Sequence, residues 1–390
     1  MKGERQSCFY RCIIEGGTRV LKKIPVAVPV LNGNESKYVM DCIESTWISS
    51  NGSYIGRFEQ QFADFCGVKH AVSCTSGTTA LHLALLAHGV QAGDEIIMPT
   101  FSFIATANAV AYCGATPVFA DSDPDTWNVD PASIVSKITD KTKGIIAVHL
   151  YGHPADMDRI NEMAEHYGLF VLEDAAEAIG AEYKGKRTGS LGDSAVFSTF
   201  GNKIITTGEG GVFTTNQDEL AAKARLLRGQ GMDPDHRYWH PIIGYNYRMT
   251  NIQAAIGCAQ MEKAEWHIAE RIRVAGLYGE ALQSLEGISL PVQKEWAKHV
   301  YWMYSVVLEG ATEQQRDLVM RQLLELGIET RPFFYPMHTM PPYRHLQPDE
   351  DFPVSMKLCA SGINLPSHAL LTKEDIQWIA DCLAKVLSRC

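Results

Sequence analysis

Residues 197–215, FSTFGNKIITTGEGGVFTT, place a single lysine, Lys203, between two runs of strand-forming residues. The run before it, Ala195–Phe200, is apolar with hydroxyl side chains set into it, which predicts a buried strand. The run after it, Gly208–Thr215, predicts a tight turn followed by a second strand. A solvated surface lysine needs neither feature, so Lys203 is predicted to lie at the floor of a pocket.

Helices and short apolar strands alternate around this stretch, from about residue 35 to residue 230. The strand patterns at 71–74, 116–121 and 144–150 are almost entirely apolar, and helical patterns such as 156–168 separate them. Strands of this kind predict a mostly parallel sheet that is covered by helices on both faces.

The regular alternation of helix and strand patterns ends after this region. Residues 250–285 form one very long helical pattern, and strand and helix patterns then alternate to the C-terminus. A helix of that length usually links domains. The predicted organisation is an N-terminal extension (1–24), a large domain (25–250), a linking helix (251–285) and a small α/β domain (286–390).

Composition excludes several classes of function. The 390 residues carry a net charge of −10, which argues against a general nucleic-acid or anionic-membrane surface but leaves room for a local cationic pocket. No apolar run is long enough to span a bilayer, and residues 1–24 lack the apolar stretch of a signal peptide. Ten cysteines without a C-x-x-C pair predict reduced thiols and a cytoplasmic location.

Two motifs could hold a charged ligand. In VLEDAAEA (171–178), Asp174 follows a strand, where ligands of open α/β sheets bind, and a buried aspartate needs a cationic partner. A helix cap or a structural ion pair would explain Asp174 equally well. In CTSGTTAL (74–81), Ser76, Gly77 and Thr78 open a helix directly after a strand, which can form an anion site. Taken alone, this motif is better explained as an ordinary helix cap.

Two further motifs could complete a site. In PTFSFIATANAV (99–110), Phe101 or Phe103 could lie on a planar ligand, although each would also suit a core position. In GYNYRMTN (244–251), Asn246 and Arg248 stand in a polar loop before the long helical pattern. Such a loop is either a simple domain boundary or part of a site.

Together these parts match the needs of pyridoxal 5′-phosphate. The lysine amine can form a Schiff base with the aldehyde of that cofactor. An aspartate can keep the pyridine nitrogen protonated, so that the ring accepts electrons from a substrate carbanion. A helix N-terminus with Ser198 can hold the phosphate, and an aromatic ring can stack on the cofactor.

The chain resembles the DegT/DnrJ/EryC1/StrS family of sugar aminotransferases from about Ile24 to the C-terminus. The resemblance is carried by SGTTAL, PTFSF, EDAAEA, FSTFGNKIITTGEGG and GYNYRMTN, which occur in the order and at the spacing of the family. It implies the aspartate-aminotransferase fold (PLP fold type I), with a large domain and a smaller C-terminal α/β domain. It also implies a homodimer with active sites at its interface.

The family resemblance implies roles for particular residues. Lys203 is the catalytic lysine that bonds the cofactor, Asp174 pairs with the pyridinium nitrogen, and Phe103 takes the stacking position. Glu177 stands near the phenolic oxygen, where many members carry glutamine or histidine, and a carboxylate there would repel a phenolate. The remaining implied cofactor contacts are Ser76, Gly77, Thr78, Ser198, Asn202 and Asn246, the last reaching the phosphate of the partner subunit.

Four other stretches resemble one branch of this family, which moves an amino group from L-glutamate to C4 of GDP-4-keto-6-deoxymannose for surface polysaccharide (O-antigen) synthesis. They are STWISSNGSYI, HLYGHPADM, RYWHPIIGYNYRMTN and ETRPFFYPMHTMPPY. The resemblance implies sugar or nucleotide contacts at Trp47, Ser49, His240, Arg331, Tyr335 and His338.

Several alternatives stay open. The substrate could be another nucleotide-linked keto sugar, such as a UDP- or dTDP-4-keto-6-deoxy sugar. A sugar dehydratase of this scaffold carries histidine in place of the lysine, so Lys203 argues against it. A sensor that binds the cofactor without catalysis is a further possibility. A metal enzyme would need more than the pairs His149/His153 and His236/His240, since neither has the glutamate of H-E-x-x-H.

Overall fold

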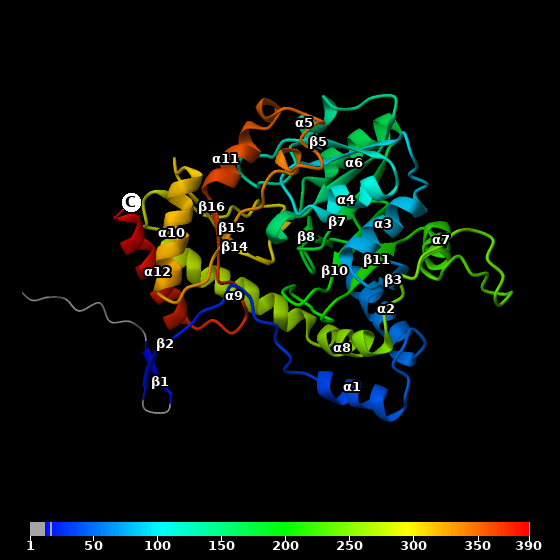
Figure 1. Ribbon diagram of the computed structural model, residues 1–390, viewed down its shortest axis with the longest axis horizontal. Coiled ribbons are helices and arrows are strands. Elements are labelled where there is room, and N and C mark those ends of the chain that lie inside the picture. Colours follow the sequence, from blue (N-terminus) through cyan, green and yellow to red (C-terminus); the bar gives the residue numbers. More distant parts are fainter. Residues whose placement is uncertain (1–11, 16–17, 390) are drawn as a thin grey trace, which may run out of the picture.

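A seven-stranded sheet forms the centre of the large domain. In the computed structural model, which describes residues 12–15 and 18–389, its strand order is β3-β11-β10-β7-β6-β4-β5 (Figure 1). The strands are β3 (His70–Cys74), β4 (Glu95–Pro99), β5 (Thr116–Ala120), β6 (Thr142–Val148), β7 (Phe170–Asp174), β10 (Ser194–Ser198) and β11 (Gly211–Thr215). Within this sheet β11 alone runs antiparallel to its neighbours, so the predicted mostly parallel sheet is confirmed.

Helices cover both faces of this sheet, because successive strand residues point to opposite sides. In β6, Ile146 packs in one apolar cluster with residues of α3 and α4, whereas Ile145 packs in another with residues of α5 and α6. A third cluster joins the sheet to α2 and to a further helix, α8 (Asn251–Met261). The helices of the large domain are α1 (Glu35–Glu44), α2 (Ser53–Cys66), α3 (Gly77–Ala87), α4 (Ala105–Tyr112), α5 (Pro131–Val135), α6 (Met157–Tyr167) and α7 (Asp218–Arg228).

The strand register gathers polar residues at one edge of the sheet. Asp174, the last residue of β7, lies opposite Val148, the last residue of β6. Ser198 ends β10 and lies opposite Gly211, which in turn lies opposite Cys74 at the end of β3. The carboxyl ends of the parallel strands therefore meet here, at the edge where open α/β sheets bind ligands.

The single linking helix predicted over 251–285 is wrong. The structure has two helices, α8 (Asn251–Met261) and α9 (Ala264–Leu282), separated at Glu262 and Lys263. Arg57 and Asn34 donate to the Glu262 carboxylate, and the Lys263 amine donates to the Asn32 carbonyl. These contacts hold the break in place, and tertiary contacts of this kind override the helical propensity of the sequence.

A four-stranded antiparallel sheet forms the centre of the small domain, in the order β12-β14-β16-β15. Its strands are β12 (Ile288–Ser289), β14 (Tyr304–Leu308), β15 (Arg331–Pro332) and β16 (Gly362–Leu365), and its helices are α10 (Glu313–Glu325), α11 (Pro353–Ser361) and α12 (Lys373–Leu387). The large domain leads into this domain through α9, which packs on α12 (Figure 1). The α/β character predicted for the smaller C-terminal domain is confirmed.

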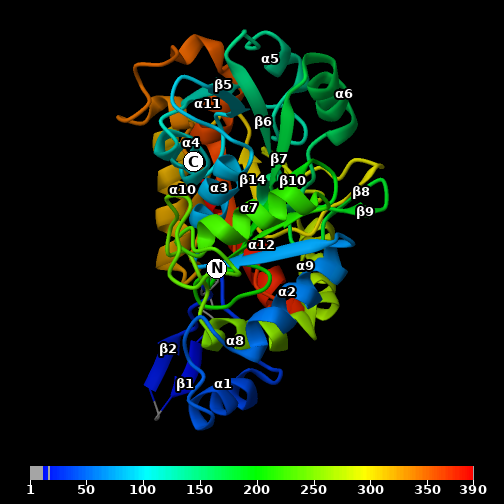
Figure 2. The same cartoon turned by 90° about the vertical axis from the view of Figure 1, so that its right-hand side faces the viewer.

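Smaller elements complete the described chain. A three-stranded sheet joins β13 (Ala297–Lys298) to β8 (Glu182–Tyr183) and β9 (Lys186–Arg187), and so ties the two domains together. Strands β1 (Cys12–Glu15) and β2 (Thr18–Leu21) pair with each other and project from the body (Figures 1 and 2). The rest of the predicted loose extension, residues 1–11 and 16–17, lies outside the described residues. Short 3-10 helices span Leu150–Gly152, Met337–Thr339 and Asp349–Asp351.

The N-terminal segment joins the small domain before it enters the large one. Ile24 pairs with Ile328, and the Ser367 N–H donates to the Val26 carbonyl. The domain boundary predicted at residue 25 therefore falls inside a segment that is bonded to the C-terminal region. Among the described helices, none combines the length and the apolarity needed to cross a bilayer.

Candidate active site

A cavity of about 390 Å³ opens at the carboxyl edge of the large sheet. It brings together residues from four separate motifs of the large domain, and it also includes Arg331 from the small domain. The predicted site residues that line it are Ser76, Gly77, Thr78, Phe103, Asp174, Glu177, Ser198, Asn202, Lys203 and Arg331.

Lys203 lies at the floor of this cavity, as predicted. Its side chain is 11% exposed, and its amine is 4.0 Å from Oε1 of Glu177. Burial lowers the pKa of the Lys203 amine, the nearby Glu177 and Asp174 oppose that effect, and Arg331 adds to it. The amine can therefore lose its proton more readily than a surface lysine, which is what a nucleophile or general base requires.

Asp174 is held as an acceptor with little choice of orientation. The hydroxyl of Thr106, on α4, donates to one carboxylate oxygen over 2.7 Å, and the Ala176 N–H donates to the other over 3.2 Å. Burial raises the pKa of Asp174, while these two hydrogen bonds lower it. A buried carboxylate facing a cavity is best stabilised by a cation placed there, which is the charge that a protonated ring nitrogen would bring.

Glu177 has one oxygen fixed and one facing the amine. The Tyr151 N–H donates to Oε2 over 2.8 Å, while Oε1 faces Lys203. Tyr151 adopts a left-handed backbone conformation with φ of 53°, which is uncommon for a bulky residue. Burial raises the pKa of Glu177 to about 7, against the opposing effect of Lys203. Near neutral pH this side chain can thus be a neutral acid, and the repulsion expected from a carboxylate is reduced.

The start of α3 forms an anion cradle against β10. Ser76 caps the helix by accepting from the Thr79 N–H, so its hydroxyl is already used. The N–H groups of Gly77 and Thr78 have no carbonyl partner within a helix and remain free for a ligand. A Cβ at Gly77 would lie 2.9 Å from the Cβ of Ser198, so only glycine allows the helix end to approach Ser198 this closely.

The two phenylalanines of PTFSF have different positions. Phe101 is buried in the core, packed near Phe333, whereas Phe103 is 56% exposed and lines the cavity. The ring centroids of Phe103 and Phe334 are 6.0 Å apart, and Phe334 comes from the segment after β15. Phe103 is therefore the ring that can stack on a planar ligand, as the family resemblance implied.

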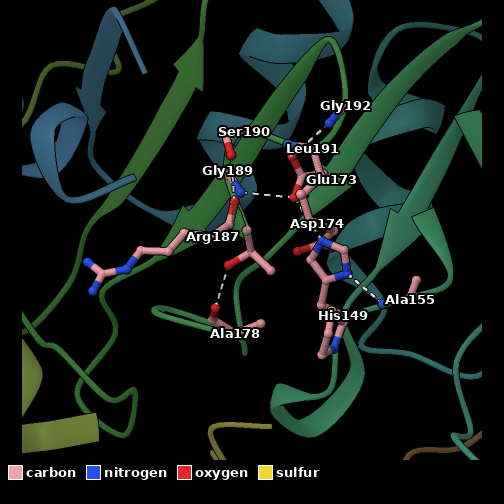
Figure 3. A network of polar contacts seen from close by, with 12 residues as sticks. His149, Ala155, Glu173, Asp174, Ala178, Arg187, Gly189, Ser190, Leu191 and Gly192 are labelled. Atoms are coloured by element: carbon pink, nitrogen blue, oxygen red, sulfur yellow. Dashed lines mark hydrogen bonds and ion pairs between the residues drawn. The ribbon is translucent and has the colours of Figure 1, made fainter. Parts of the chain in front are cut away.

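A buried network behind Asp174 fixes the end of β7 (Figure 3). The Glu173 carboxylate is fully buried and accepts from the N–H groups of Gly189, Leu191 and Gly192. His149 lies 3.0 Å from the same carboxylate through Nε2. Because the Ala155 N–H donates to Nδ1 of this histidine, the proton sits on Nε2, which donates to Glu173. Glu173 and Asp174 alternate in direction, so one anchors the strand while the other faces the cavity.

Six of the predicted site residues lie elsewhere in the single chain. Trp47, Ser49, His240 and Asn246 are exposed and do not line the cavity. The Tyr335 hydroxyl donates to Glu313, away from the floor. The prediction that His338 contacts the sugar is not supported by its position, because its ring is fully buried, with Nδ1 2.6 Å from the Thr100 hydroxyl and the ring against Phe352.

The sequence analysis missed several residues of the site. Thr106 lies inside the quoted stretch 99–110, and its place at the start of a helix after a strand was a usable signal. Trp302 and Phe334 line the cavity, and Tyr151 reaches the site only through its backbone N–H, which binds Glu177. Phe334 and Tyr151 lie in stretches quoted above for the family resemblance, whereas Trp302 becomes part of the site through tertiary packing alone.

The residues present fit pyridoxal phosphate. At Gly77 the absence of a Cβ leaves the backbone N–H groups at the start of α3 close to Ser198, as donors for a phosphate, and Asp174 can supply the negative charge opposite a pyridinium. Asn202 has a buried side-chain oxygen without a hydrogen-bond partner, which a ligand hydroxyl could satisfy. The histidine pairs have other roles: His149 bonds Glu173, His153 lies 2.7 Å from the Pro154 carbonyl, and the loop of His236 and His240 is exposed.

Comparisons with known proteins agree with this chemistry. The sequence profile of the DegT/DnrJ/EryC1/StrS aminotransferase family matches residues 29–384. The chain is 56% identical to a GDP-perosamine synthase of Caulobacter vibrioides, over 94% of this chain and 99% of that protein. It is 47% identical to a GDP-perosamine synthase of Escherichia coli O157:H7, over 94% of this chain and 100% of that protein. A solved structure described as a sugar aminotransferase of Streptococcus pneumoniae, in its PLP form, superposes with a TM-score of 0.90 at 26% identity, covering 94% of this chain and 99% of that one.

Replacing Glu177 by glutamine is expected to flatten the pH dependence of stability in the ligand-free protein. The pKa of Glu177 is raised from 4.5 to about 7 on folding, so its contribution to stability is complete below pH 4.5 and is lost as the pH rises through 7. The loss for the natural protein is about 2–3 kcal/mol across this window. Urea unfolding at pH 5 and pH 7.5 measures it.

Glu286→Gln, an exchange at an exposed glutamate, serves as the matched control and should keep the natural pH slope. Equal slopes for the natural protein and Glu177→Gln would contradict the assignment of a buried, protonatable carboxyl at position 177.

Proposed function

The chain belongs to the DegT/DnrJ/EryC1/StrS aminotransferase family, and we propose that it transfers an amino group from L-glutamate to C4 of GDP-4-keto-6-deoxy-D-mannose, giving GDP-perosamine. The observation that carries the proposal is the near full-length similarity to two GDP-perosamine synthases. A cavity with a buried lysine supports it. The product is a 4-amino sugar of the kind used in surface polysaccharides such as O-antigen.

The cofactor is pyridoxal 5′-phosphate, which when bound supplies an aldehyde carbon and an electron-accepting ring. The N–H groups of Gly77 and Thr78 and the Ser198 hydroxyl would hold its phosphate at the start of α3. Phe103 would cover one face of the ring. Asp174, oriented by Thr106, would keep the ring nitrogen protonated.

Lys203 performs the proton transfers in this proposal. Its amine stands at the cavity floor, and burial favours the neutral form. A neutral amine can take a proton from the amino-acid carbon of glutamate and, once charged, return a proton to a neighbouring atom. Glu177 lies 4.0 Å from the same nitrogen, so the protonation states of these two groups depend on each other. In the second half of the reaction the same steps run in reverse on the sugar.

Arg331 supplies a cation at the cavity wall. It comes from β15 of the small domain and is half-exposed, 3.8 Å from Glu329. Both substrates carry anionic groups, a carboxylate in glutamate and phosphates in the nucleotide sugar. A guanidinium can bind either group through paired hydrogen bonds. Arg331 is therefore proposed as a substrate-binding residue, in contrast to the buried His338.

In a homodimer, predicted site residues that lie outside the cavity of their own chain would reach the cavity of the partner. Asn246, Trp47, Ser49 and His240 lie on the surface of segments that also expose large apolar side chains. Those apolar side chains are Met40, Ile43, Ile48, Tyr238, Trp239, Ile242 and Ile243. Exposed apolar side chains of this kind favour burial against another protein surface. A second copy of the chain would cover them and bring Asn246 to the phosphate in the partner's cavity.

A cytoplasmic location is proposed with this function. Among the described residues, Cys42, Cys66, Cys74, Cys113, Cys258 and Cys359 are free thiols, and all of these except Cys113 are buried. Free thiols at buried positions suit a reducing compartment.

Turnover tests the substrate assignment. Purified protein with pyridoxal phosphate, L-glutamate and GDP-4-keto-6-deoxymannose should yield a 4-amino sugar, identified by mass and NMR. The UDP- and dTDP-linked 4-keto-6-deoxy sugars should react with a kcat/KM lower by about 10²-fold or more, since a polar base site rejects ligands that leave its groups unpaired. Lys203→Ala should abolish the reaction.

A preference for the UDP- or dTDP-linked sugar would replace the proposed substrate while keeping the reaction. Tight cofactor binding without turnover on any keto sugar would favour the sensor over the enzyme.

Subunit mixing tests the shared site. Lys203→Ala and Asn246→Asp are each expected to be nearly inactive as homodimers, the latter because its charge repels the phosphate. When equal amounts are unfolded and refolded together, half of the dimers carry both variants, and each of these has one intact site. Activity should therefore recover to about one quarter of that of the natural protein.

No recovery would show that residues 203 and 246 serve the same chain's cavity, or that the protein acts as a monomer. Either result would contradict the proposed arrangement. Mixing Lys203→Ala with Asp174→Ala provides the control: both residues serve the cavity of their own chain, so each cavity of the mixed dimer carries one defect and no activity should be recovered.

A further inference from the structure

The indole ring of Trp302 lies directly beside the Lys203 amine. The Nζ atom is 3.6 Å from the ring centroid. Trp302 is 5% exposed, and its ring lines the cavity. Its side-chain N–H donates to the carbonyl of Asn202, the residue just before the lysine, over 2.9 Å. One side chain thus contacts both the lysine amine and the backbone that carries it.

Trp302 is fixed from several directions. Arg271, buried on α9, donates to its carbonyl over 3.3 Å. Two residues earlier, the Val300 N–H donates to the Gly152 carbonyl over 3.0 Å. Gly152 has a φ of +105°, and a Cβ there would meet the backbone nitrogens of Tyr301 and Trp302 at 2.9 Å. The backbone that carries the ring is therefore held by Gly152 of the large domain on one side and by α9 on the other.

Three charged groups act on the Lys203 amine besides this ring. They are Glu177 at 4.0 Å, Asp174 on the neighbouring strand and Arg331 from the small domain. A flexible lysine would be drawn to either carboxylate if nothing else held it. An aromatic face attracts an ammonium group without adding a further negative charge to the cavity.

We propose that Trp302 is a positioning residue for Lys203: its indole face holds the ε-ammonium whenever the amine is not bonded to another group, and its N–H fixes the backbone beside it. The proposal rests on the proposed function, since it concerns the same lysine. It means that the freed amine stays beside the reacting atoms and does not form a lasting ion pair with Asp174 or Glu177.

Fluorinated tryptophan tests this without a change of shape. Fluorine withdraws electrons from the ring and weakens its attraction for a cation. The full-length protein is made with natural tryptophan, 5-fluorotryptophan or 5,7-difluorotryptophan. Ligand-free samples are then treated with trace acetic anhydride across a pH series, because only neutral amines react. Peptide mass spectrometry compares Lys203 with the exposed Lys186 as internal reference.

The pKa of Lys203 should fall stepwise with fluorination, by roughly 0.5–1 unit in total, because the ammonium loses its partner. In Trp302→Phe, which keeps an aromatic face, fluorination of the remaining six tryptophans should leave the pKa of Lys203 unchanged. A merely structural role for Trp302 would give no dependence on fluorine, since the ring keeps its packing.

An unchanged Lys203 titration in the fluorinated natural sequence, or an equal shift in Trp302→Phe, would overturn the proposal. Failure of the proposed function gives a different result. In that case Lys203 could still respond to fluorination, but addition of pyridoxal phosphate would produce no covalent adduct on it.

Discussion

The burial of one amine beside two carboxyl groups is the constraint on which this structure depends. Lys203, Glu177 and Asp174 line one cavity at the carboxyl edge of the large sheet. Burial lowers the pKa of the lysine and raises the pKa of both carboxyl groups, so it favours the neutral form of all three. Burying an unpaired charge in such a cavity destabilises the folded protein by several kcal/mol, so the surrounding chain must orient a partner for each group. The hydrogen bonds from Thr106 and from the Tyr151 N–H satisfy this need for the two carboxyl groups.

Elements far apart in the sequence supply that orientation. Glu173 anchors the strand end from behind by binding three backbone N–H groups and His149. The strained turn at Tyr151 presents its N–H to Glu177 and its ring to Trp302 and Phe334. The small domain contributes Arg331 and Phe334 to the wall. The cavity is thus formed where the two domains meet, which explains why neither domain alone contains all its residues.

Much of this could be predicted from the sequence, for identifiable reasons. Apolar strands between amphipathic helices predicted the mostly parallel sheet, and strand-end positions predicted that Asp174, Ser198 and Gly77 would meet. The break at Glu262 and Lys263 was missed because it depends on contacts with Asn32, Asn34 and Arg57, which are distant in the sequence. Trp302 was missed because its contact with Lys203 joins residues about a hundred positions apart. His338 was misjudged because a motif match gives no information on which way a side chain points.

The proposed function requires that the Lys203 amine bond covalently to the aldehyde of pyridoxal phosphate. Incubation of the protein with excess cofactor, reduction with borohydride and peptide mapping by mass spectrometry detect this bond. We expect a reduced phosphopyridoxyl group on the peptide that contains residue 203, and a yellow colour that borohydride removes. A protein that stays colourless and carries no adduct there, or an adduct confined to another lysine, would contradict it.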